Sequence, residues 1–244
     1  MTIFLKANWE YIIMANYVID PVLLKPFVPK GVELNLFDGK CYVSLVGFMF
    51  KDTKLFGVPI PYYGTFEEIN LRFYVVRKEG DEVKRGVVFI NETIPYPIVA
   101  WMANKLYKEH YTVVPTKHKI KTDAPHKDVQ FEWLLNNRWN SIAVTATTNS
   151  KMMAKGSLEK FIFEHYYGYT KVDQNNTEEY KLQHPSWLIN EVLDYKIDCD
   201  FKAMYGDAFS VLNQTKPEAV FIAEGSAVAI EWKRNRINFA HEKH

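Results

Sequence analysis

Apolar and polar residues alternate along most of this chain with the period of two that is typical of β-strands. Residues 40–50 (KCYVSLVGFMF) form the clearest run, and apolar side chains occupy both of its faces. A strand with this pattern is covered on both sides. Further β-branched and aromatic runs predict strands at 84–92, 129–135, 140–150, 164–172, 191–201 and 219–232, the last as two strands joined by a tight turn at Glu224-Gly225-Ser226.

Helical spacing is rarer in this sequence. In PYPIVAWMANKLYKEH (95–110), Ile98, Met102 and Leu106 recur at helical intervals after two prolines, so we expect a helix at 96–108 that packs its apolar side on the sheet. A short helix is expected in LEKFIFE, with Ser157 as its N-cap. Because no repeat and no long linker divides these elements, they predict one domain over residues 1–244, with a β-rich α+β fold and a closed or nearly closed sheet.

The run FEEINLRFYV (66–75) predicts a strand with Glu68, Asn70 and Arg72 on one face and apolar residues on the other. This polar face has two readings. It lies in water, as on a half-buried antiparallel strand, or it lines an internal cavity while the helix at 96–108 covers the apolar face. If the face is enclosed, its charges must pair or meet a ligand, because an unpaired buried charge is strongly destabilising.

Composition and charge exclude several classes of protein. The chain has 244 residues, 48% of them hydrophobic, and a net charge of +1, which describes an ordinary globular protein. Lysines and arginines are scattered among acids, so no nucleic-acid partner is expected. No uninterrupted apolar run could span a bilayer and the first residues lack a signal peptide, so we expect no membrane partner and a cytoplasmic location. Cys41 and Cys199 are the only cysteines and are expected to be buried and unpaired.

The sequence contains no motif for nucleotide, dinucleotide or serine-hydrolase chemistry, and no cofactor is expected. Its histidines lack the spacings of metal ligands, so no metal site is expected. His184, just before Pro185 and Trp187, is a candidate base or donor facing a cavity, and the alternative is a histidine that caps a buried turn against Trp187. The histidines are His110, His118, His126, His165, His184, His241 and His244.

Several longer motifs occur in a recognisable order. They are the D-P-x-x-L-x-P-x-V-P-x-G-V-E-L run from Asp20 to Leu34, the E-x-N-x-R strand, the segment GSLEKFIFEHYYGY and a late HPSW. In these motifs nearly the whole chain resembles the YqjF-like family, an uncharacterised family with a domain of unknown function, in the acetoacetate decarboxylase-like superfamily. The resemblance implies a large mixed sheet curled into a partly open, cone-like barrel with a ligand cavity inside and a few helices outside.

The resemblance also implies where chemistry would occur and where this chain departs from it. In the decarboxylases a lysine after the outer helix forms a Schiff base with a β-keto acid, and a glutamate faces the same pocket; Glu68 falls on the position of that glutamate. In place of the lysine pair this chain reads Glu109-His110-Tyr111-Thr112. The nearby Lys105 and Lys108 are expected on a solvated helix face. Decarboxylation through an imine is therefore not expected.

The leading interpretation is a cavity that binds a small organic carboxylate or carbonyl compound and is lined by Glu68, Asn70, Arg72, Tyr111 and His184. If the protein is an enzyme, Arg72 would hold a carboxylate or enolate, Glu68 would transfer a proton, and Tyr111 or His184 would be a second donor. The alternatives are a non-catalytic protein whose pocket is vestigial or senses a ligand, and a scaffold in which Glu68 and Arg72 fix the register of the sheet. Catalysis stays open at this point, as does association into a homo-oligomer.

Overall fold

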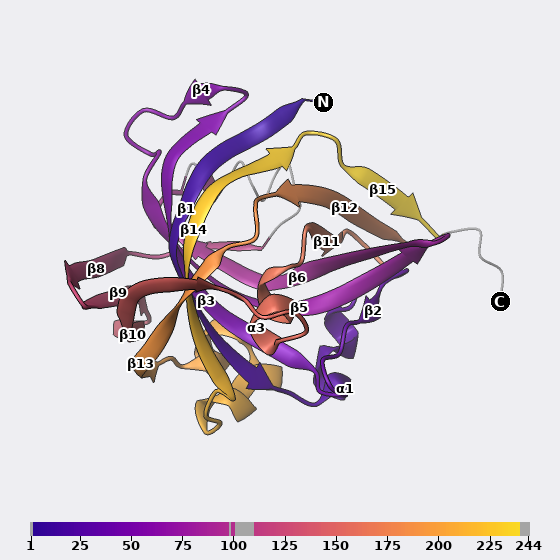
Figure 1. Cartoon of the computed structure of the whole chain (residues 1–244). Helices are drawn as coiled ribbons and strands as arrows, with labels where there is room; N and C mark the ends of the chain where they lie inside the picture. Colours follow the sequence, from indigo (N-terminus) through magenta and orange to yellow (C-terminus); the bar gives the residue numbers. More distant parts are fainter. Residues whose placement is uncertain (1, 98, 101–109, 240–244) are drawn as a thin grey trace.

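The computed structural model describes residues 2–97, 99–100 and 110–239, so Lys105 and Lys108 and most of the helix expected at 96–108 lie outside the described residues (Figure 1). The helices are α1 (Pro21–Leu24), α3 (Leu158–Phe163) and α4 (Phe201–Tyr205), with the 3₁₀ helices η1 (Lys25–Phe27) and η2 (Asp207–Asn213). The strands are β1 (Ile3–Val18), β2 (Glu33–Leu34), β3 (Tyr42–Leu55), β4 (Val58–Pro59), β5 (Phe66–Glu79), β6 (Glu82–Ile94), β7 (Tyr111–Val113), β8 (Thr116–Asp123), β9 (His126–Leu135), β10 (Arg138–Met152), β11 (Tyr167–Lys171), β12 (Asn176–Gln183), β13 (Leu188–Asp198), β14 (Ala219–Glu231) and β15 (Asn235–Asn238).

These strands form one 15-stranded mixed sheet that curls on itself (Figure 1). Its main path runs β15-β12-β11-β6-β5-β3-β1-β14-β13-β10-β9-β8, and an additional pairing of β12 with β14 closes part of this path into a ring. Neighbours on the path are mostly antiparallel, but β6 pairs in parallel with β11 and with β7. The predicted β-rich fold with a large, curled, partly open sheet is confirmed.

Strand β5 lies between two hydrophobic cores. On one side, Ile69 and Leu71 pack with Phe131 from the arm of the sheet formed by β13, β10, β9 and β8. On the other side, inside the ring, lies a second core that contains Trp9 and Phe48. The alternation of side chains along β5 therefore turns its apolar face toward the arm and its polar face into the ring.

The expectation that the helix at 96–108 covers the apolar face of β5 is wrong for the described residues of that segment. The arm covers that face instead, through β8 and β9. Val99 lines the cavity inside the ring and Ala100 belongs to the second core, so both lie on the polar side of β5.

Two other expectations about strands are corrected. No turn interrupts residues 219–232, because β14 runs through Glu224-Gly225-Ser226 as one strand. Gly225 has a φ of +84°, and any Cβ there would collide with the backbone of Trp9, so this glycine serves a close approach of two strands. The strand expected at 191–201 ends at Asp198, and Asp200 caps α4 by accepting a hydrogen bond from the amide of Ala203.

Other local expectations hold. The run at 40–50 forms the first part of β3 from Tyr42 onward, and β3 is buried on both faces from Tyr42 to Phe50. Ser157 caps α3 by accepting a hydrogen bond from the amide of Lys160. Within the described part of the chain, no helix has the length and apolar character needed to cross a membrane.

Candidate functional site

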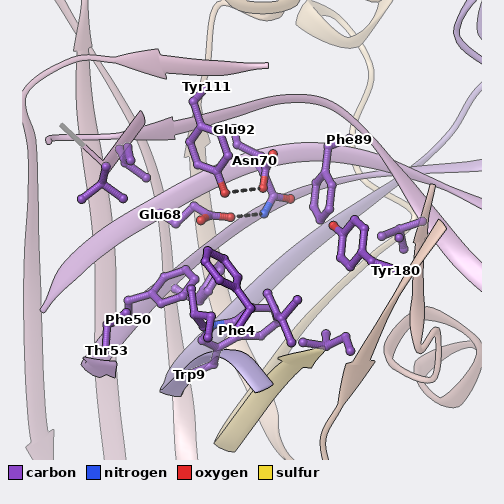
Figure 2. A pocket seen from close by; sticks show the side chains of 18 of the residues that line it. Phe4, Trp9, Phe50, Thr53, Glu68, Asn70, Phe89, Glu92, Tyr111 and Tyr180 are labelled. Atoms are coloured by element: carbon purple, nitrogen blue, oxygen red, sulfur yellow. Dashed lines mark hydrogen bonds between the residues drawn. The ribbon is translucent and has the colours of Figure 1, made fainter. Parts of the chain in front are cut away.

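A cavity of about 120 Å³ lies inside the ring, against the polar face of β5. An apolar cavity of about 150 Å³ holds benzene, so this one suits a molecule of about six non-hydrogen atoms. Aromatic side chains form much of its wall, and Phe4, Trp9 and Phe50 lie across from the polar residues of β5 (Figure 2). The charged and hydrogen-bonding residues of the lining are Trp9, Thr53, Glu68, Asn70, Arg72, Glu92, Tyr111, His165, Tyr167, Tyr180 and Arg234.

Two carboxylates and their partners gather on one wall of the cavity (Figure 2). Asn70 Nδ2 donates to Glu68 Oε1 over 3.0 Å, and Tyr111 Oη donates to Glu92 Oε1 over 2.8 Å. Asn70 on β5 is directly opposite Glu92 on β6, which places the two pairs side by side. Glu68, Asn70 and Glu92 are each less than 5% exposed, so the polar face of β5 is enclosed and does not lie in water.

Arg72 is a buried cation without a carboxylate partner in the described part of the chain. It is 9% exposed, its Nη2 contacts Met14 Sδ at 3.6 Å, and its Nε makes no hydrogen bond. Its guanidinium lies 5.9 Å from the ring centre of Tyr74. The other arginine of the lining, Arg234, has a carboxylate oxygen of Glu178 at 3.6 Å. Arg72 is therefore the lining cation whose charge most needs a counterion.

Buried polar side chains hold the strands behind Arg72. Arg72 is opposite Ser44 in the sheet, and Ser44 Oγ lies 2.6 Å from Tyr74 Oη and donates to Asn16 Oδ1 over 2.6 Å. These groups are fully enclosed and satisfy one another. A connected polar network of this kind fixes the arrangement of the neighbouring strands, so Arg72 stands on a rigid support.

His165 lines the cavity and was not among the predicted site residues. Its Nε2 lies 3.1 Å from Asn35 Nδ2, which can only donate, so Nε2 accepts. Burial, followed by the charges of Arg72 and Arg85, lowers the pKa of His165 to about 3. The ring is therefore neutral at physiological pH. The signal available for it was its place in the segment GSLEKFIFEHYYGY, which carried part of the family resemblance.

The other predicted site residues divide between the cavity and its surroundings. Glu68, Asn70, Arg72 and Tyr111 all line the cavity, but His184 is not among its described lining residues. His184 stacks on Trp187 with 4.0 Å between ring centres, and burial lowers the pKa of its imidazole. This is the arrangement of the alternative reading, in which the histidine packs on the turn before Trp187.

No lysine occurs among the described residues that line the cavity, and Lys105 and Lys108 are not described. Among the described residues, no group of three or more histidine, cysteine or acidic side chains is arranged to hold a metal ion. Cys41 is buried, and burial raises the pKa of its thiol to about 11, so the thiolate form is scarce at neutral pH. The chemistry of the described cavity thus rests on carboxylates, guanidinium groups, phenols, an amide and a neutral imidazole.

A family model and a bacterial relative match most of this chain. The model of the DUF2071 family, described as an uncharacterized conserved protein, matches residues 6–227. The uncharacterized protein YqjF of Bacillus subtilis (strain 168) is 24% identical over 190 residues, which cover 76% of this chain and 74% of YqjF.

Solved structures of several enzymes share the fold. An acetoacetate decarboxylase-like enzyme from Sphingomonas wittichii RW1 superposes with a TM-score of 0.66 at 11% identity, covering 98% of this chain and 95% of that one. The enduracididine biosynthesis enzyme MppR complexed with pyruvate superposes with a TM-score of 0.65 at 11% identity, covering 98% and 92%. The acetoacetate decarboxylase-like architecture is thus established for this chain.

Proposed function

The chain belongs to the DUF2071 family, with an acetoacetate decarboxylase-like fold, and we propose that it binds a small organic carboxylate in the cavity inside the ring, with Arg72 as the anion-binding group. The observation that carries this proposal is the burial of the Arg72 guanidinium without a carboxylate partner in the described chain. Removing a charge from water costs several kcal/mol unless it is paired. A carboxylate ligand supplies that pair, and a guanidinium can bind it through two parallel hydrogen bonds.

Two further features support an organic acid as the ligand. The aromatic wall opposite Glu68 and Asn70 gives an apolar surface for a short carbon skeleton (Figure 2). Among proteins of the same fold, MppR is known in complex with pyruvate, an acid of the size that this cavity holds.

A second candidate function is proton transfer next to a carbonyl group, which the carboxylates in the cavity favour. In this function Arg72 would hold the substrate carboxylate or enolate, and Glu68 would exchange a proton with the neighbouring carbon. Tyr111 is the candidate donor toward the substrate oxygen, which would require its hydroxyl to turn away from Glu92, the acceptor of its one proton in the structure. The chemistry would proceed without an imine, because the sequence has Glu109-His110-Tyr111-Thr112 where the decarboxylases carry their lysines. Borohydride trapping in the presence of a keto acid should give no covalent adduct, and labelling of Lys105 or Lys108 would contradict this expectation.

A thermal-shift screen of small carboxylates tests binding. The wild-type chain should be stabilised by at least one acid of about six non-hydrogen atoms, since a ligand that binds only the native state raises the melting temperature. The variant Arg72→Met should lose the shift. The matched control is Arg138→Met, at an exposed arginine on β10 that pairs with Asp198 outside the cavity, and it should keep the shift. Equal shifts in wild type and Arg72→Met would refute the assignment of Arg72.

A further inference from the structure

Hydrogen-bond acceptors are concentrated on the wall of the cavity that holds Glu68, Asn70 and Glu92 (Figure 2). Glu68 accepts from Asn70, and Glu92 accepts from Tyr111. An ionised carboxylate only accepts hydrogen bonds, so neither of these side chains donates one. A ligand that touches this wall is therefore in contact with acceptors.

The side chain of Asn70 gives the most direct evidence that this wall needs a hydrogen-bond donor from a ligand. Its Nδ2 donates to Glu68, which fixes the orientation of the amide, because the reverse orientation would place two acceptor oxygens together. Asn70 is 1% exposed, and its Oδ1 has no hydrogen-bond partner in the described chain. Buried polar atoms in proteins are nearly always hydrogen-bonded. We therefore expect a ligand to place a hydrogen-bond donor beside Asn70 Oδ1.

Arg72 lies on the same strand as Asn70, which sets the distance between the anion-binding guanidinium and the acceptor wall. Arg72 and Asn70 are two residues apart on the same face of β5, which places their Cα atoms about 7 Å apart. A molecule of about six non-hydrogen atoms can thus place an anionic end at Arg72 and another group at the acceptor wall. The ligand has to place an anionic group at Arg72 and a hydrogen-bond donor at the acceptor wall.

We propose that the ligand is a small acid that carries a hydrogen-bond donor, a hydroxyl or an amino group, next to its carboxylate. This inference rests on the proposed function, since it assumes that the carboxylate binds Arg72. The carboxylate would meet the guanidinium, and the donor would point to the wall of Glu68, Asn70 and Glu92. A simple oxo acid offers that wall only a carbonyl oxygen, which is an acceptor, so it leaves the Asn70 acceptor unpaired and meets the carboxylates unfavourably.

Calorimetric titration of the wild-type chain with four acids of similar size separates the need for a carboxylate from the need for a neighbouring hydrogen-bond donor. Propionate has the carboxylate alone, pyruvate adds an acceptor, lactate adds a hydroxyl donor, and alanine adds an ammonium donor. We expect lactate or alanine to bind at least about tenfold more tightly than propionate, as a hydrogen bond to a charged group contributes, and pyruvate to bind no more tightly than propionate. The tighter of lactate and alanine identifies the donor.

Two neighbouring glutamates on β5 provide a matched pair of variants. Glu68→Gln, on the cavity wall, replaces an acceptor by a group that also donates, so the preference for lactate or alanine over pyruvate should shrink at least severalfold. Glu67→Gln is the control, because Glu67 faces away from the cavity and bonds to His118 and Thr116; the preference should not change. Circular dichroism checks that both variants fold.

The outcomes distinguish this inference from the proposed function. Binding of pyruvate as tight as that of lactate and alanine would overturn the donor requirement but leave the carboxylate site standing. An unchanged preference in Glu68→Gln would also overturn the assignment of the donor to this wall. Failure of all four acids to bind, together with a negative thermal-shift screen, would overturn the proposed function and this inference with it.

Discussion

Replacing Arg72 by methionine should stabilise the protein in the absence of ligand. The substitution keeps an unbranched apolar side chain of similar length and removes a charge that is 9% exposed and has no carboxylate partner in the described chain. Proteins commonly retain such a destabilising group when a functional site requires it. A rise in stability on its removal would identify Arg72 as a binding group and not as a structural anchor.

The size of the effect follows from the contacts of the guanidinium. Burial of an unpaired ion costs several kcal/mol, and hydrophobic replacement of buried ionic groups stabilises proteins by about 1–4 kcal/mol. The ring of Tyr74 lies 5.9 Å away, and a cation–π contact offsets about 0.5–2 kcal/mol of that cost. The contact with Met14 Sδ at 3.6 Å is a weak hydrogen bond. The free energy of unfolding of Arg72→Met should therefore rise by about 0.5–2 kcal/mol.

Urea unfolding measures this change, and the slope with denaturant should be the same for both proteins. Arg138→Met is the control, because loss of an exposed ion pair changes stability by less than about 1 kcal/mol. A loss of about 1 kcal/mol or more in Arg72→Met, at unchanged slope, would refute the reasoning. It would instead support the interpretation that Arg72 fixes the register of the sheet.

Three other substitutions test the description of the cavity and its surroundings. In Gly168→Ala the new Cβ would overlap the ring of Tyr180. We therefore expect the free energy of unfolding in urea to fall by about 1–3 kcal/mol and carboxylate binding to weaken. Unchanged binding would contradict the placement of Tyr180. The pKa of His165 is lowered to about 3 in the native chain, so the unfolded chain binds a proton more readily. The contribution of this residue to the free energy of unfolding is therefore complete above a pH of about 6.5 and declines as the pH falls toward 3. His165→Gln should flatten that decline in unfolding curves recorded at several pH values, and an unchanged pH profile would show that His165 is not buried as described. Burial raises the pKa of Glu67, but hydrogen bonds from His118 and Thr116 outweigh it and bring the pKa below the ordinary value of 4.5. The stability that Glu67 contributes is therefore present above that value and is lost as the pH falls through the native pKa. Glu67→Gln should remove this acid-sensitive part of the stability, and an acid limb identical to that of the wild type would contradict the pairing.

The polar face of β5 shows what the local pattern can and cannot reveal. The alternation of Glu68, Asn70 and Arg72 with apolar residues is sufficient to predict a strand. The same alternation fits a face in water and a face that lines a cavity, because only the packing of distant strands decides which it is. The family resemblance supplied that long-range information, and the structure encloses all three side chains.

Other elements escaped prediction for identifiable physical reasons. The first strand, β1, was not predicted because its alternation is interrupted where its register shifts between Glu10 and Ile13, and Tyr11 there has a φ of +56°. Gly225 suggested a turn because glycine is common in turns, but it permits two strands to approach closely inside β14. His165 precedes β11 and lines the cavity, and its hydrogen-bond partner Asn35 is far away in the sequence, so local sequence does not reveal this position.

A crystal structure of the wild-type chain with lactate bound would test carboxylate binding at Arg72 directly. We predict that the ligand occupies the cavity with a carboxylate oxygen about 2.9 Å from a guanidinium nitrogen of Arg72, and with its hydroxyl toward Glu68 and Asn70. A carboxylate bound away from Arg72, with the guanidinium still unpaired, would contradict the account.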